Sequence, residues 1–83
     1  MPERPSRLSR PLVAMPPDVS TALDAAHLRE AYAARPPYQR NDYLAWITRA
    51  VRPETRAKRL DQMLRELEAG HGYMNMAWHR RQS

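Results

Sequence analysis

The sequence predicts an all-α fold, a small bundle of four short helices. In four successive segments, apolar residues recur at the i, i+3, i+4 spacing that defines one face of a helix. Prolines at 16–17, 36–37 and 53 separate these segments, and no stretch alternates apolar and polar residues over enough positions to predict a strand. With 83 residues, the chain has room for one small domain.

The first two predicted helices are short. The first begins at Pro16-Pro17-Asp18, because proline suits the first turn of a helix, and its apolar face includes Val19 and Leu23. The second runs from 25 to about 34 and ends at the next proline pair. We expect the Asp24 carboxylate to cap this second helix by accepting hydrogen bonds from its free N–H groups.

The third and fourth predicted helices are longer and have clearer apolar stripes. The third covers about 37 to 51, with Trp46 at the edge of a stripe made of Tyr43, Leu44, Ile47, Ala50 and Val51. The fourth covers about 53 to 69, with a stripe made of Leu60, Met63, Leu64 and Leu67. Gly70 is placed to end the fourth helix, because glycine readily adopts the left-handed conformation found there.

Three regions follow from this pattern. Residues 1–15 contain Pro, Ser and Arg without periodicity and are predicted to be a flexible leader, and residues 16–70 form the helical domain. Residues 71–83 form a C-terminal tail without a cap or a clear period, predicted to be partly disordered. Whether this tail packs on the helices is left open, with Tyr73 favoured to pack.

The composition excludes several kinds of chemistry. The chain has no Cys and only two Gly, so it contains neither a cysteine-based site nor a glycine-rich phosphate loop. The three histidines, His27, His71 and His79, are widely separated, and we expect no metal and no cofactor. No nucleophile stands in a pattern with a base, which predicts a protein that is not an enzyme. The absence of a membrane-length apolar run or a signal peptide predicts a cytoplasmic protein.

The positive charge lies mostly at the ends of the chain. The net charge is +5, and residues 15–70 contain nine basic and eight acidic residues, a net of only +1. Binding of nucleic acid usually needs basic residues clustered on a folded face. This balance therefore weakens, without excluding, a nucleic-acid partner.

One basic cluster nevertheless falls between the third and fourth predicted helices. The candidate residues for binding an anion or a partner are Arg49, Arg52, Thr55, Arg56, Arg59 and Trp46. Arginine side chains and the free N–H groups at a helix start can hold a phosphate or a carboxylate. The alternative is a structural clamp, in which these arginines pair with helix C-terminal carbonyls or with Asp42, Asp61 or Glu66.

Several motifs resemble the helical domain of the YdeI or OmpD-associated family, also called the bacteriocin-protection family. The resemblance covers 15–70, about two-thirds of the chain. It rests on Pro17-Asp18-Val19 with Ala22-Leu23, Tyr43-Leu44-Ala45-Trp46-Ile47-Thr48-Arg49-Ala50, Arg52-Pro53-Glu54-Thr55-Arg56-Ala57-Lys58-Arg59-Leu60, Met63-Leu64 and Gly70. The W-I-x-x-A motif followed by P-E-T-R-x-x-R is the most specific part.

The resemblance implies a compact helical domain with a role in bacteriocin or antimicrobial-peptide protection or in envelope stress. Many such domains follow a small β-barrel domain, so the implied partners are an unknown protein or a neighbouring small β-barrel, and the leader resembles the end of an interdomain linker. The family brings no established reaction. We therefore predict a non-enzymatic helical interaction module, with a nucleic-acid-binding protein that uses Arg49–Arg59 as the alternative.

Overall fold

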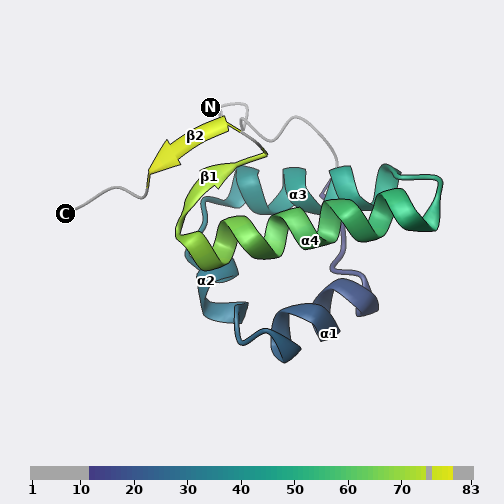
Figure 1. The fold of residues 1–83 in the computed structure, drawn as a ribbon, viewed down its shortest axis with the longest axis horizontal. Helices are drawn as coiled ribbons and strands as arrows, with labels where there is room; N and C mark the ends of the chain where they lie inside the picture. Colours follow the sequence, from purple (N-terminus) through teal and green to yellow (C-terminus); the bar gives the residue numbers. More distant parts are fainter. Residues whose placement is uncertain (1–11, 75, 80–83) are drawn as a thin grey trace, which may run out of the picture.

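The computed structural model describes residues 12–74 and 76–79, which form four helices and a short hairpin. The order is α1 (Pro17–Ala25), α2 (Arg29–Ala33), α3 (Pro37–Arg49), α4 (Pro53–Ala69), β1 (His71–Tyr73) and β2 (Met76–His79). The helices α3 and α4 lie side by side, α1 and α2 lie below them in the view of Figure 1, and the hairpin lies at the end of α4. The predicted all-α bundle of four short helices is confirmed, with this hairpin added.

Three of the four helices begin at a proline, as the sequence predicts. Pro17, Pro37 and Pro53 occupy the first turns of α1, α3 and α4, and the residue before each is extended, with ψ between 138° and 150°. Proline fixes φ near its helical value and disfavours helical geometry at the preceding residue, so it sets a helix start. The local sequence therefore determines where these three helices begin.

The ends of α1 and α4 use left-handed residues. Gly70 has φ 81° and follows the last residue of α4, which confirms the predicted stop. At the end of α1, His27 has φ 59°, its N–H donates to the Asp24 carbonyl at 3.1 Å, and the Leu28 N–H donates to the Leu23 carbonyl at 2.9 Å. This is the Schellman pattern, with histidine at the position that glycine usually occupies.

The core is formed between α3, α4 and the elements packed on them. Its buried apolar residues come from all four helices and from β1: Val19, Leu23, Tyr32, Tyr43, Leu44, Ile47, Met63, Leu67 and Tyr73. The predicted stripes of α3 and α4 supply five of these nine, which confirms the face that each long helix turns inward. Among the described residues, no helix is both long enough and apolar enough to cross a bilayer.

The structure corrects the prediction for Val51. This residue was placed in the apolar stripe of the third helix, but its side chain is 95% exposed. The helix ends at Arg49, and Ala50 turns to an extended conformation with ψ 125°. Because the chain leaves the helix before Val51, the helical spacing no longer points that side chain toward the core.

The second helix and its cap also differ from the prediction. The helix α2 begins at Arg29 instead of residue 25, and Leu28 at its N-terminal boundary makes no side-chain capping hydrogen bond. Asp24 lies within α1, and its carboxylate pairs with the Arg29 side chain at 2.5 Å instead of capping α2. This ion pair keeps the carboxylate at the surface. The hydrogen bond from Arg29 also lowers the pKa of Asp24 below its ordinary value.

The hairpin was not predicted, because strands of three and four residues are too short to show an alternating pattern. The strands pair antiparallel, with His71 opposite His79 and Tyr73 opposite Met76. Two left-handed residues shape this segment, Gly72 with φ 89° and Met74 with φ 51°. Tyr73 is buried in the core, so the tail packs on the helices over these residues. Of the flexible leader predicted over 1–15, residues 1–11 lie outside the described residues, as does the predicted disorder of 80–83. Residues 12–15 are described, and Val13 and Met15 pack against the core instead of extending freely.

A cluster of buried polar groups fixes the hairpin to the bundle. The Arg35 side chain is buried and donates hydrogen bonds to the Glu66 carbonyl at 3.0 Å, the Gly72 carbonyl at 2.7 Å and the Gln39 side chain at 3.1 Å. The Glu66 carboxylate accepts hydrogen bonds from the Tyr43 hydroxyl and from the backbone N–H of Met74. One arginine therefore links the start of α3, the end of α4 and β1.

Candidate functional site

The candidate site predicted from the sequence lies where α3 passes into α4, at the end of the molecule away from the hairpin (Figure 1). We call it the α3–α4 corner and define it as residues 49–59 with Trp46. Two helix ends create it: α3 stops at Arg49, and Pro53 starts α4. The six predicted residues are therefore brought to one region, but their side chains are engaged in different ways.

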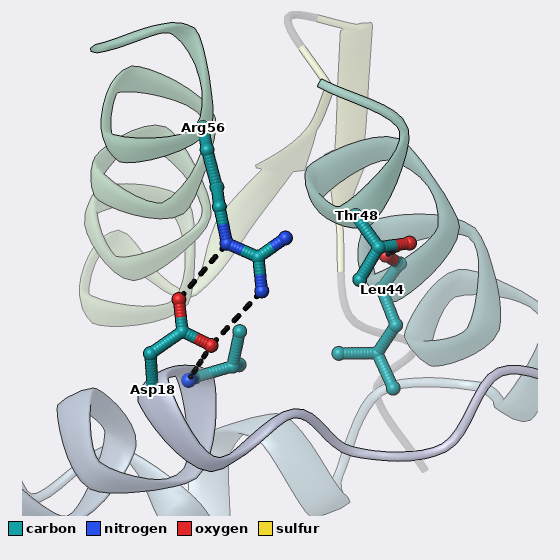
Figure 2. Close-up of polar contacts among 5 residues, drawn as sticks. Asp18, Leu44, Thr48 and Arg56 are labelled. Carbon is teal, nitrogen blue, oxygen red and sulfur yellow. Dashed lines mark hydrogen bonds and ion pairs between the residues drawn. The ribbon is translucent and has the colours of Figure 1, made fainter. Parts of the chain in front are cut away.

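Arg56 is used inside the molecule. Its guanidinium binds both carboxylate oxygens of Asp18, with nitrogen–oxygen distances of 3.0 Å and 3.0 Å, as Figure 2 shows. The hydrogen bond from Arg56 is the main reason that the pKa of Asp18 lies below its ordinary value, and a hydrogen bond from the Val19 N–H acts in the same direction. The pair joins the first turn of α4 to the first turn of α1.

Arg59 is also engaged within the bundle. Its Nη1 donates to the Trp46 carbonyl at 2.6 Å, in the last turn of α3, and its guanidinium carbon lies 5.4 Å from the centre of the Trp46 ring. A cation near the last carbonyls of a helix interacts favourably with the helix dipole. The contacts of Arg56 and Arg59 match the structural-clamp alternative, although Asp18 was not among the predicted partners.

The rest of the corner faces solvent. Arg49, Val51 and Arg52 are exposed, and Arg52 lies 3.8 Å from the Glu54 carboxylate, with both of these side chains more than two-thirds exposed. No ion pair of Arg49 and no side-chain hydrogen bond of Thr55 occurs within residues 12–74 and 76–79. The corner thus exposes an apolar side chain and the two cationic ones that flank it in the sequence.

The exposed surface contains cations and an aliphatic group, and over the described residues no three His, Asp or Glu side chains converge to form a candidate metal site. The exposure of Val51 was missed from the sequence, because Pro53 disfavours helical geometry only at Arg52 and nothing marked the earlier end of the helix at Arg49. The burial of Arg35 had no sequence signal either.

The comparisons with known proteins agree with the motifs. The model of the family described as bacteriocin-protection, YdeI or OmpD-associated matches residues 13–70, which contain α1 to α4 and the whole corner. No curated protein and no solved structure matches the chain. The match confirms the resemblance drawn from the sequence and places the hairpin outside the family region.

Proposed function

Because the chain belongs to the bacteriocin-protection, YdeI or OmpD-associated family, we propose that it contributes to such protection as a non-enzymatic helical interaction module. Its contact surface is the α3–α4 corner. Its partner is a protein whose surface presents carboxylates around an apolar patch.

The exposure of Val51 between Arg49 and Arg52 carries this proposal. A valine side chain gains about 1.5 kcal/mol when it moves from water into an apolar contact, and at 95% exposure this gain is still available to a partner. Arginine is enriched at protein interfaces and binds carboxylates with two parallel hydrogen bonds. An acidic partner with an aliphatic contact would therefore satisfy all three side chains.

Arg56 and Arg59 have a supporting role in this proposal. Because Arg56 donates to Asp18 and Arg59 donates to the Trp46 carbonyl, these two arginines hold the corner in place and leave recognition to the exposed residues. The corner is therefore held rigid before a partner binds, which reduces the conformational entropy lost on binding.

Variants of the exposed residues test the proposal in cells. We expect Val51→Ser combined with Arg49→Gln and Arg52→Gln to reduce survival in the presence of a bacteriocin when this variant replaces the natural protein. Arg65→Gln is the matched control, because Arg65 is a similarly exposed arginine on α4 whose ion pair, to Asp61 at 2.8 Å, lies within its own helix. Both proteins should unfold at nearly the same temperature as the natural chain. Full protection by the triple variant would refute the role of the corner.

A salt titration tests the nucleic-acid alternative. Each phosphate contact makes affinity for duplex DNA fall by nearly one log unit per log unit of salt. Binding of a short duplex that persists at about 0.15 M salt and is lost in the triple variant would favour the nucleic-acid alternative over a protein partner.

A further inference from the structure

A second surface feature lies at the other end of α3 from the corner. It is an open groove of about 250 Å³ beside Asn41, lined by Leu12, Val13, Tyr32, Pro37, Arg40 and Leu44. Pockets for small molecules and cofactors usually enclose roughly 300–1,000 Å³. This groove is thus of a size to receive one side chain of a partner rather than a whole cofactor.

The segment before α1 forms part of the groove. The Val13 N–H donates to Oδ1 of the buried Asn41 at 2.8 Å, which fixes the backbone of this segment against α3. The neighbouring Leu12 forms one wall and is 76% exposed. Leu12 and Val51 are the large apolar side chains most exposed among residues 12–74, and each lies at a different surface feature.

Arg40 gives the groove its charge. Its Nε donates to the Arg35 carbonyl at 3.1 Å, which anchors the guanidinium, and its two terminal nitrogens have no partner within residues 12–74 and 76–79. Among the residues that the structure describes, those that line the groove include no acidic one. The Tyr32 hydroxyl donates to the Arg40 carbonyl at 3.4 Å; burial raises the pKa of this hydroxyl, and the charge of Arg40 acts in the opposite direction. The groove therefore combines apolar walls with one anchored cation that has no carboxylate partner in the described part of the chain.

We propose that the groove binds a peptide segment of a protein partner in which an aliphatic side chain lies next to a carboxylate. The aliphatic group contacts Leu12, Pro37 and Leu44, and the carboxylate accepts two hydrogen bonds from the terminal nitrogens of Arg40. The groove is a second contact surface, separate from the corner, and it does not depend on the function proposed there.

The test uses two probes that differ only in charge. N-acetyl-leucine has an isobutyl group and a carboxylate, and N-acetyl-leucinamide has the same isobutyl group without the charge. We expect N-acetyl-leucine, titrated into the full chain, to shift the amide NMR signals of Val13, Arg40 and Leu44 saturably. The neutral amide should bind roughly tenfold more weakly, because it loses the charge-assisted hydrogen bonds.

Variants assign the binding to the groove. Arg40→Gln should weaken N-acetyl-leucine binding to the level of the neutral amide, and Leu12→Ser should weaken both probes, while Arg65→Gln leaves both unchanged. If Arg40→Gln does not fold, the comparison of the two probes on the natural chain still decides.

Several results would overturn the proposal. Equal affinity for the two probes would exclude recognition by Arg40. Tighter binding of hexanoate than of N-acetyl-leucine would point to a small carboxylic acid in place of a peptide. Shifts of the same amide signals with protein concentration alone would show that a second copy of the chain fills the groove. None of these results bears on the cell-survival assay of the corner.

Discussion

Replacing Arg35 with alanine should destabilise the protein more than any change to the predicted arginine cluster. Arg35 is only 4% exposed, and its removal leaves the Gly72 carbonyl and the Gln39 side-chain oxygen without this donor, while the Glu66 carbonyl keeps the hydrogen bond from the Gly70 N–H. Each buried acceptor that is left without a donor lowers the free energy of unfolding by about 1–3 kcal/mol. Removing Arg35 also removes the desolvation penalty of its buried charge, which offsets part of this loss. We expect a net loss of about 3 kcal/mol in the free energy of unfolding, which lowers Tm by about 12–24 °C for a domain of this size.

Thermal unfolding followed by circular dichroism measures this effect, and amide hydrogen exchange shows where the structure loosens. The Arg35→Ala protein should lose protection first in the hairpin, because the Gly72 carbonyl is one of the acceptors. The stability of the Arg35→Lys protein should lie between those of the natural and the Arg35→Ala proteins, because one ammonium cannot reach three acceptors as a planar guanidinium does. Arg65→Ala, at an exposed position of α4, should change stability by less than about 0.5 kcal/mol. An Arg35→Ala protein that unfolds within that same margin, with an unchanged hairpin, would refute this account of the buried cluster.

Three further predictions concern the remaining ionic, aromatic and strained residues. A double-mutant cycle of Arg56→Ala and Asp18→Asn should give a coupling energy of about 0.2–1 kcal/mol, which is small because the pair is partly exposed. Since the folded protein lowers the pKa of Asp18, the coupling should be present at pH values above the ordinary pKa of 3.8 and should disappear as the pH falls below it. Coupling that persists in acid would contradict the assignment. The hydroxyls of Tyr43 and Tyr73 donate to carboxylates, and burial is the main cause that raises their pKa values. Both hydroxyls should therefore stay protonated above the ordinary pKa of 10.0, and the free energy of unfolding should fall as the pH rises past that value. An absorbance titration in which all tyrosines ionise before the protein unfolds would argue against this. His27→Gly should raise the free energy of unfolding by up to about 1 kcal/mol, because glycine adopts the left-handed conformation without strain, and a loss of stability in urea unfolding would show that the histidine side chain is needed.

The candidate site was predictable as a set of residues but not as a set of contacts. The sequence places Arg56 and Arg59 near one helix start, and helical spacing puts them on one face. The partner of Arg56 is Asp18, 38 positions earlier, and nothing in the local sequence distinguishes this carboxylate from the other acidic residues. The groove around Arg40 could not be predicted from the local sequence for the same reason, because one of its lining residues, Leu12, comes from the segment before α1.

By itself, the sequence determined the helical class, the starts of α1, α3 and α4, and the inward faces of the long helices. These features depend on bonds and side chains within one or two turns, where proline fixes φ and glycine permits a positive φ. Tertiary structure alone decided which arginines are buried, which are paired and which remain available to a partner, and it also decided that residues 71–79 form a hairpin. Those outcomes depend on carbonyls and carboxylates that distant segments bring together, as the three acceptors around Arg35 illustrate.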